Sequence, residues 1–439
     1  MLDRLASVES ELLNRWPENK LEPTLDRITA LLDLVGNPHR EVPAIHITGT
    51  NAKSTTARMI DELLRSAGLR TGRYTSPHLE SVRERIVIDG SILDATVFVD
   101  TYEELRPHIR TVDNMSAVPL SFFEIVTAIG LVSFARARVD AMVIEVGMGG
   151  TWDATNVVDG RVAVITPVSL DHQDYLGADE IAIATEKSGI VKFGSTLVAA
   201  PQLPCVTDVL KARTRDIGAT FVSTGQAVNI VERALDNGRQ ILHLRTGRND
   251  YSEITLPIVG HHQAENACTA VAAAEIFLAE SETPLNPGHA RHGFSQVTAP
   301  GRLETVSASP TTVIDASHNP AGMQVSTLGF REAHPHTKTV VVLAVLGDKD
   351  IDGILQSLAD TAWRLVLTEN ESPRRLPVEQ LAAHARTVVS REILHIEPDM
   401  ARALTFAREL ARSEDDRAAN VLVTGSVITA GQARRLLAR

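Results

Sequence analysis

Cysteine is almost missing from this chain. Among 439 residues the two cysteines, Cys205 and Cys268, stand in unrelated contexts. They supply neither a disulfide framework nor the spacing of a metal site, and such a sequence is typical of a reducing compartment. Positive charge is not in excess either, since 43 Lys and Arg stand against 55 Asp and Glu, a formal net charge of −12. This charge excludes non-specific nucleic-acid binding, because a phosphate backbone would be repelled.

Long apolar runs are also missing. The chain contains no stretch of roughly 18 apolar residues, the length that a membrane-spanning helix needs. Residues 1–10 are acidic with a helical pattern and do not have the form of a signal sequence. We therefore expect a cytoplasmic protein that has no membrane partner.

Aromatic residues make up 4% of the chain, whereas Ala, Val, Leu and Ile dominate, as in parallel strands buried beneath helices. Apolar runs of strand length alternate with helical periods, for example Ala44–Thr48, Ala141–Val146 and Val162–Thr166. This alternation predicts an α/β fold with a parallel sheet covered on both faces. Ligands of such sheets bind beyond the carboxyl ends of the strands.

The length of 439 residues is too great for one ordinary core. A break at Pro300-Gly301 precedes a second alternating series that begins at Thr312–Asp315. We therefore predict two domains, residues 1–298 and residues 299–439, the second of a size that can form its own α/β core.

Residues 45–56 carry the strongest local signal. The sequence Ile-His-Ile-Thr-Gly-Thr-Asn-Ala-Lys-Ser-Thr-Thr reads as a strand, a polar loop and the start of a helix that Gly68 ends. Backbone N–H groups, a helix N-terminus and the Lys53 ammonium would meet at one point, which suits a polyphosphate such as that of ATP. The usual phosphate-loop pattern has glycine where Ile47 and Ala52 stand. The alternative is an ordinary strand-to-helix turn with a solvent-facing lysine.

Polar residues follow several other predicted strands and helices in the first half of the chain. Glu145 ends an apolar strand, where a carboxylate is tolerated only if it is paired or binds a cation. With Ser76 and His172 at neighbouring strand ends, hydroxyl, carboxylate and imidazole suit a divalent cation that bridges nucleotide phosphates. Each also has a structural alternative, since Glu145 can be a satisfied carboxylate, His172 a capping or core histidine, and Lys187 a lysine on a solvated helix face.

Further motifs lie in the second half. Residues 261–267 open an alanine-rich helix, and Asp315 and His318 follow a predicted strand before a proline. A pair of that kind is equally consistent with helix capping.

Taken together, the motifs have a recognisable order. They are Gly49-Thr50-Asn51-x-Lys53, Tyr74-Thr75-Ser76-Pro77-His78-Leu79, Glu84-Arg85-Ile86, Glu145-Val146-Gly147-x-Gly149-Gly150, Asp171-His172, Lys187-x-Gly189-Ile190, Gly301-Arg302-Leu303-Glu304, Asp315-x-x-His318-Asn319-Pro320, Asp348-Lys349-Asp350 and Thr424-Gly425-Ser426. This set resembles the folylpolyglutamate synthase/dihydrofolate synthase family of the Mur ligase superfamily. The resemblance implies an N-terminal phosphate-loop ATPase domain with a parallel sheet, and a smaller, Rossmann-like C-terminal domain.

The resemblance also assigns roles to particular residues. It implies that ATP is bound by Gly49, Thr50, Asn51, Lys53, Ser54, Thr55, Asn266, Arg302 and Asp315, and that Mg²⁺ is bound by Ser76, Glu145 and His172. Lys187 matches a lysine that becomes carbamylated near a second metal site in relatives. Lys53, Lys187 and His318 are the implied catalytic residues. Ala52 departs from the family, which usually has glycine before the lysine, and a methyl group there costs stability if the position needs a positive φ.

The implied reaction is ligation of L-glutamate to dihydropteroate, to a reduced folate or to both, through an acyl phosphate and by a monomer. The residues do not decide between these acceptors. Two alternatives stay open at this point. One is a Mur-type ligase of cell-wall precursors, and the other is a non-catalytic nucleotide-binding relative, for which Ala52 is the argument.

Overall fold

The computed structural model describes residues 2–15, 23–413 and 419–438. Contacts between residues divide the chain into two compact units, each built from several segments. Unit 1 comprises Met1–Arg233, Leu242–Thr255 and Glu265–Val297. Unit 2 comprises Ala234–Ile241, Leu256–Ala264 and Thr298–Arg439.

The main sheet of unit 1 has the strand order β4-β3-β2-β5-β1-β6-β7-β8. Its strands are β1 (Ala44–Thr48), β2 (Thr71–Tyr74), β3 (Ile86–Ile88), β4 (Ser91–Ile92), β5 (Ala141–Glu145), β6 (Gly160–Ile165), β7 (Thr196–Ala199) and β8 (Thr220–Ser223). Neighbours from β2 to β8 pair in parallel, and β3 and β4 add an antiparallel edge. The predicted α/β class is confirmed.

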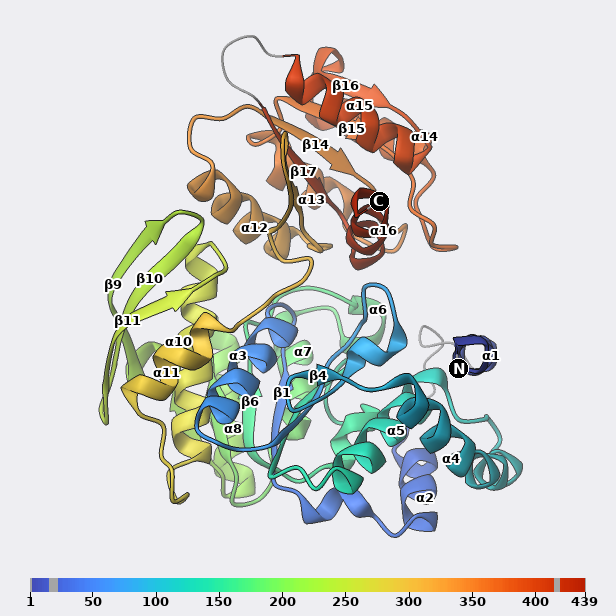
Figure 1. The fold of residues 1–439 in the computed structure, drawn as a ribbon, viewed down its shortest axis with the longest axis vertical. Helices are drawn as coiled ribbons and strands as arrows, with labels where there is room; N and C mark the ends of the chain where they lie inside the picture. Colours follow the sequence, from blue (N-terminus) through green and yellow to red (C-terminus); the bar gives the residue numbers. More distant parts are fainter. Residues whose placement is uncertain (1, 16–22, 414–418, 439) are drawn as a thin grey trace. The chain divides into compact units, whose positions relative to one another are not determined.

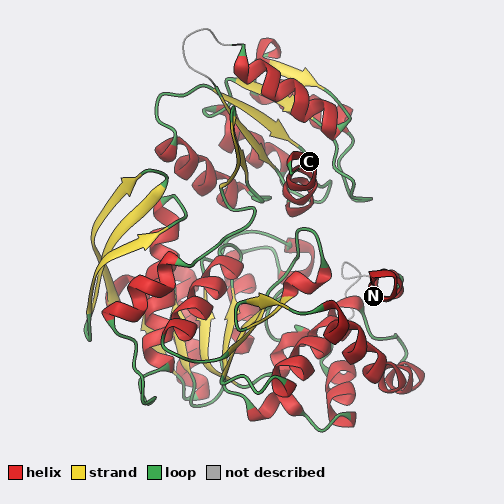
Figure 2. Ribbon diagram, viewed as in Figure 1, coloured by secondary structure: helices red, strands yellow, loops and turns green. Residues whose placement is uncertain are grey.

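Helices cover both faces of this sheet (Figures 1 and 2). They are α1 (Leu2–Leu13), α2 (Asp26–Leu34), α3 (Lys53–Ser66), α4 (Ala95–Met115), α5 (Phe122–Arg136), α6 (Gln173–Leu176), α7 (Glu180–Lys187), α8 (Pro204–Ile217) and α9 (Thr224–Ala227). Met142 and Ile144 of β5 join one apolar cluster with residues of α1, α2, α4 and α5. Ala163 and Ile165 of β6 join another cluster with residues of α7 and α8. Apolar strand residues buried on both sides explain the near-continuous apolar runs in the sequence.

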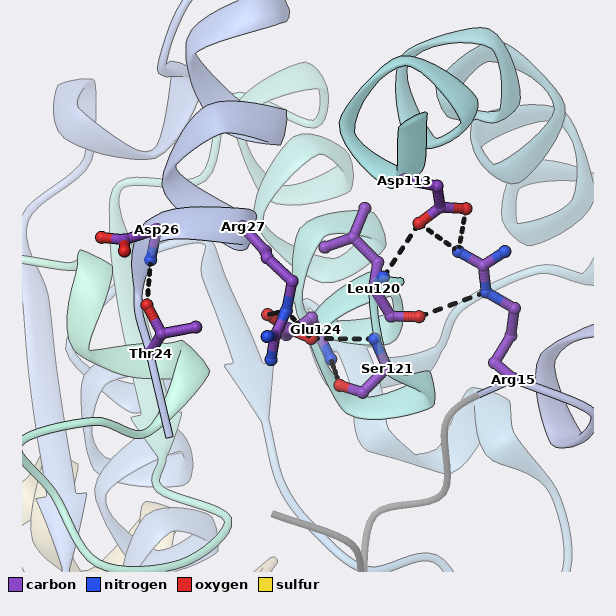
Figure 3. Close-up of polar contacts among 8 residues, drawn as sticks. All are labelled: Arg15, Thr24, Asp26, Arg27, Asp113, Leu120, Ser121 and Glu124. Atoms are coloured by element: carbon purple, nitrogen blue, oxygen red, sulfur yellow. Dashed lines mark hydrogen bonds and ion pairs between the residues drawn. The ribbon is translucent and has the colours of Figure 1, made fainter. Parts of the chain in front are cut away.

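Two arginines anchor the N-terminal helical segments to α4 and α5 (Figure 3). The Arg27 side chain of α2 forms an ion pair of 3.0 Å with Glu124, and Arg15 forms one of 2.7 Å with Asp113. Glu124 also closes a capping box with Ser121 at the start of α5. Because these contacts occupy its oxygen atoms, Glu124 is a structural carboxylate that links α2 to α5.

A separate three-stranded sheet has the order β11-β10-β9, and sequence reasoning missed it. Its strands are β9 (Val228–Asp236), β10 (Arg239–Thr246) and β11 (Asp250–Leu256), and α10 (His261–Phe277) and α11 (Pro287–Ser295) follow. The strands of this sheet have mostly exposed or half-exposed side chains. They therefore lack the apolar runs that mark the strands of the main sheet.

Unit 2 contains a six-stranded sheet of order β12-β13-β17-β14-β15-β16. Its elements are β12 (Glu304–Ala308), β13 (Thr311–Ile314), α12 (Pro320–Ala333), β14 (Thr339–Leu343), α13 (Ile351–Ala359), β15 (Arg364–Leu367), α14 (Val378–Val388), β16 (Leu394–Ile396), α15 (Met400–Arg412), β17 (Asn420–Thr424) and α16 (Val427–Leu437). The strands are parallel except for β12. Val341 and Leu343 of β14 pack with α13 and α14, whereas Val340 and Val342 pack with α15, so this sheet is also buried on both faces.

Two glycines allow the segment Leu256–Ala264 to lie against α12 within unit 2. A Cβ atom added to Gly329 would lie 3.0 Å from the Cα atom of Gly260, and Gly260 itself has a φ of +104°. A side chain at either position would separate the two backbones. Among the described residues, no helix combines the length and the apolarity needed to cross a membrane.

Candidate active site

The phosphate loop lies between β1 and α3 and is held tightly against the loop after β6. A Cβ atom at Gly49 would lie 1.9 Å from the Thr166 side-chain oxygen, so only glycine fits there. Thr50 donates its backbone N–H to the carbonyl of Pro167 at 3.0 Å and its hydroxyl to the carbonyl of Ser169 at 2.9 Å. The loop is therefore preorganised, with the N-terminus of α3 at its end.

Lys53 is the first residue of α3 and turns back over the loop. Its Nζ atom donates to the carbonyl oxygens of Gly49 and Thr50 at 3.0 and 3.1 Å. The interpretation of Lys53 as an ordinary solvent-facing lysine is therefore wrong. Asn51 donates from its side chain to the Ser169 hydroxyl at 3.3 Å, so the polar residues of the motif converge on one loop.

Glu145 joins the phosphate helix to the loop that follows β2. Its Oε1 accepts a hydrogen bond from the Ser54 hydroxyl at 2.8 Å, and its Oε2 accepts one from the Ser76 N–H at 3.1 Å. Only 1% of the Glu145 surface is exposed. The strand order explains the meeting, because β5 lies between β1 and β2. The sequence analysis assigned Ser54 to the nucleotide site but did not predict its hydrogen bond to Glu145. No sequence motif indicates such a pair.

Lys187, the last residue of α7, is buried rather than solvated. Burial, followed by repulsion from Lys53, lowers the pKa of Lys187 from 10.5 to about 7. The backbone of the glycine-rich loop after β5 is adjacent, since a Cβ atom on Gly150 would lie 2.6 Å from the Lys187 carbonyl oxygen. Among the described residues, no hydrogen bond or ion pair engages its Nζ atom. A buried amine that is partly neutral near pH 7 can act as a nucleophile.

His172 and Asp171 follow β6 on the loop before α6. His172 has a positive φ of 52°, and its backbone N–H donates to the Asp171 carboxylate at 2.9 Å. Among the described residues, no group of three or more His, Cys, Asp or Glu side chains is arranged to hold a metal ion. The structure brings Ser76 to Glu145 directly.

The predicted residues of the second half lie in two places. Asn266 is buried on α10, in unit 1. In unit 2, the Asp315 carboxylate accepts backbone hydrogen bonds from Leu303 and Ser317, both at 3.0 Å, and Arg302 directly precedes Leu303. His318 Nδ1 lies 3.0 Å from the carbonyl oxygen of Ala316, so Nδ1 carries a proton that it donates to this carbonyl.

Comparisons with known proteins agree with this arrangement. Residues 47–274 match the Mur ligase middle domain, and residues 301–427 match the glutamate ligase domain of Mur ligases. The dihydrofolate synthase/folylpolyglutamate synthase of Mycobacterium tuberculosis is 42% identical over 99% of this chain and 94% of its own length. The chain belongs to the folylpolyglutamate synthase/dihydrofolate synthase family of Mur ligases. It is thus a Mur-type ATP-dependent ligase, as the ordered motifs predicted.

Solved structures of this family share the fold. The Mycobacterium tuberculosis folylpolyglutamate synthase complexed with ADP and AMPPCP superposes with a TM-score of 0.94 at 42% identity, over 100% of this chain and 99% of that one. Escherichia coli FolC, solved in complex with DHPP and ADP, gives a TM-score of 0.84 at 28% identity, over 99% and 97% of the two chains. The membership favours the folate branch over a ligase of cell-wall precursors and over a non-catalytic relative.

Ala52, which stands where the family resemblance implies glycine, has a backbone conformation that favours glycine. The residue has φ 68° and ψ −1°, in the left-handed region. This conformation costs an L-residue about 1–2 kcal/mol, which glycine would not incur. Glycine also has more freedom in the unfolded chain, which reduces the stability gained by the substitution by about 0.4–1 kcal/mol. We expect Ala52→Gly to raise the free energy of unfolding by about 0.5–1 kcal/mol, measured by urea denaturation.

Ala67 provides the matched control at the other end of α3, because its φ is −80°. Ala67→Gly relieves no strain and should lower the free energy of unfolding by about 1 kcal/mol. If the two substitutions changed stability in the same direction, left-handed strain at Ala52 would not be the cause.

Proposed function

We propose that this protein uses ATP to join the amino group of L-glutamate to the carboxylate of dihydropteroate, of a reduced folate, or of both. The observation that supports this reaction best is the link from the phosphate loop through Glu145 to Ser76, in a chain of this family. It sets the groups that suit a polyphosphate beside the strand end at which an acceptor can approach. The assignment places the protein in folate biosynthesis.

A carboxylate does not react directly with an amine, so the first step transfers the γ-phosphoryl group of ATP to the acceptor carboxylate. The Lys53 ammonium and the N-terminus of α3 neutralise the charge that moves with this group, and Gly49, Thr50 and Asn51 shape the loop that holds the phosphates. The glutamate amine then attacks the acyl carbon, the amide bond forms and phosphate leaves. Ser54 and Thr55, at the first turn of α3, complete the nucleotide site in this proposal.

Magnesium is the cation that this site would take. The Ser76 hydroxyl and the Glu145 carboxylate are oxygen ligands of the kind that Mg²⁺ prefers, and Mg²⁺ takes its other ligands from phosphates and water. The backbone hydrogen bond from Ser76 to the Glu145 carboxylate keeps these two oxygen donors adjacent. We propose His172 as a third participant on the basis of the family resemblance. When bound, the ion would supply charge neutralisation at the phosphates.

Lys187 is proposed to carry a carbamate at a second cation site. Its neutral amine would attack CO₂, form an N–C bond and release a proton, which turns a cation into an anion. The lowered pKa of about 7 supports this proposal, because the attacking form is then well populated at neutral pH. Asn266, Arg302 and Asp315 are proposed nucleotide contacts, and His318 is a proposed catalytic residue. We further propose that the enzyme acts as a monomer.

Phosphate release from Mg-ATP tests the function. With glutamate present, dihydropteroate and tetrahydrofolate are compared as acceptors, and we expect release that requires both an acceptor and glutamate. Release with dihydropteroate alone would mark a dihydrofolate synthase, release with tetrahydrofolate alone a folylpolyglutamate synthase, and release with both a bifunctional enzyme. ATP binding without acceptor-dependent release would contradict the proposal.

A further inference from the structure

The ring of His78 is hydrogen-bonded to its neighbour Arg85. The guanidinium Nε–H of Arg85 donates to His78 Nδ1 at 3.0 Å. A guanidinium can only donate, so Nδ1 must accept and therefore carries no proton. The ring is consequently neutral, and its single N–H is on Nε2.

The surroundings of this pair are rigid. Arg85 is buried, and its Cζ atom lies 5.0 Å from the centre of the Phe122 ring. The backbone directly after His78 is fixed as well, because the Glu84 carboxylate accepts hydrogen bonds from the N–H groups of Leu79 and Ser81, both at 2.9 Å. The bond from Arg85 and the fixed backbone after His78 together set the direction of the Nε2–H bond.

This donor has no recipient within the part of the chain that the structure describes. No hydrogen bond or ion pair of Nε2 is found among the described residues, and Nε2 is not among the fully buried polar atoms that lack a partner. A fixed, accessible and unpaired donor on a loop at a strand end is suited to binding a ligand.

The strand order indicates that the acceptor, rather than the nucleotide, approaches this loop. On the β6 side, the phosphate loop is already bonded to the following segment through Thr50 and Pro167. On the other side, Glu145 leads to Ser76, two residues before His78. Two residues span at most about 7 Å. A carboxylate that attacks the γ-phosphorus must come within about 3–3.5 Å of it, so an acceptor that approaches from the side of β2 passes the loop that carries Ser76 and His78.

We propose that His78 binds the reacting carboxylate of the acceptor through Nε2–H, and that Arg85 is a positioning residue that holds the ring for this task. The inference rests on the proposed function. A donor at Nε2 suits this role because it holds one carboxylate oxygen by a hydrogen bond. The second oxygen keeps its lone pairs for the attack on phosphorus. The Arg85 charge behind the ring polarises Nε2–H and strengthens its bond to an anion.

Two amide substitutions separate the two ring nitrogens. His78→Asn keeps an acceptor near the position of Nδ1, where Arg85 donates, but removes the donor at Nε2. His78→Gln places an amide donor near the position of Nε2 and gives up the contact with Arg85. Each variant is titrated with dihydropteroate in the presence of AMPPCP, and with the analogue in which hydrogen replaces the carboxyl group. The Kd of ADP and the melting temperature report whether the site and the fold are intact.

For His78→Asn we expect the Kd of dihydropteroate to rise roughly 10- to 100-fold, the effect of losing a hydrogen bond to a charged group. The Kd of the decarboxylated analogue and that of ADP should stay within about twofold of wild type. His78→Gln should retain most of the dihydropteroate affinity. Arg85→Met should weaken the binding of dihydropteroate but not that of the analogue, and Arg85→Lys should bind dihydropteroate more tightly than Arg85→Met.

Other results would overturn the inference. If His78→Asn raised the Kd of dihydropteroate and that of the decarboxylated analogue equally, His78 would contact another part of the acceptor. Greater damage from His78→Gln than from His78→Asn would make the contact with Arg85 the whole role of the histidine. If both His78→Asn and His78→Gln bound dihydropteroate as wild type does, the role of His78 would be contradicted, whereas the proposed function would not. If the wild-type protein bound neither dihydropteroate nor tetrahydrofolate, the proposed function would fail first.

Discussion

Replacing Lys53 with methionine is expected to lower acceptor-dependent phosphate release by about 100- to 1,000-fold, the cost of removing one preorganised group that stabilises a moving charge. Methionine keeps the length and apolar stem of lysine but removes the ammonium that lies over the Gly49 and Thr50 carbonyls. Nucleotide affinity should fall too, because the proposed contact of the ammonium with the phosphates would also exist in the ground state. Steady-state phosphate release and titration with ADP measure the two effects.

Lys192→Met is the matched control for this substitution. Lys192 is also half-buried, and its Nζ atom donates to a backbone carbonyl, that of Asn156, at 3.2 Å. It belongs to none of the proposed site groups, so we expect kcat within about twofold of wild type once stability is accounted for. A loss of less than about tenfold for Lys53→Met would show that the helix N-terminus and the backbone suffice without the ammonium.

Replacing Lys187 with methionine is expected to reduce kcat by at least about 100-fold, if a carbamate on this residue provides an anion that the reaction needs. A small carboxylate such as acetate resembles the carbamate and should restore part of the activity of Lys187→Met. Acetate should not raise the activity of the wild-type enzyme or of Lys192→Met. Activity of Lys187→Met close to that of wild type would contradict the carbamate.

The same substitution has a second consequence, for stability as a function of pH. Below the folded pKa of about 7 both the folded and the unfolded protein carry the proton on Lys187, and the folded state bears the full cost of the buried charge. Between pH 7 and the ordinary value of 10.5, the unfolded chain binds a proton that the folded protein has lost. Stability of the wild-type protein relative to Lys187→Met therefore rises with pH through this window. Urea denaturation at pH 6 and pH 9 in CO₂-free buffer, where Lys187 is a free amine, should show Lys187→Met favoured by roughly 1–3 kcal/mol at pH 6 and by less at pH 9.

Much of the α/β fold was predictable because the signals are local. The apolar run at Ala44–Thr48 became β1 without change, and Gly68, the predicted end of the following helix, has a φ of +95° one residue after the C-cap of α3. Strand-end residues could be recognised because parallel strands place their carboxyl ends at one edge of the sheet. The order of the motifs supplied the family, which the comparisons confirm.

Contacts between distant segments could not be predicted in this way. The bond from Ser54 to Glu145 depends on the insertion of β5 between β1 and β2, which no local pattern encodes. The burial of Lys187 likewise depends on packing against the glycine-rich loop after β5, since its helix alone is consistent with a solvated lysine. The left-handed backbone at Ala52 was a stated condition of the sequence argument, and only the structure shows that it applies.

The close approach of Gly260 and Gly329 bears on how this protein can be recombined. The segment Leu256–Ala264 precedes residue 298 in the chain but groups with the C-terminal unit, and the two glycines bring it against α12. A chimera that exchanges only residues 299–439 for those of a relative would therefore pair a foreign α12 with the resident segment. If the incoming helix carried a residue with a β-carbon in place of Gly329, the contact between the two backbones would be lost. A stable chimera therefore has to exchange the segment Leu256–Ala264 together with α12.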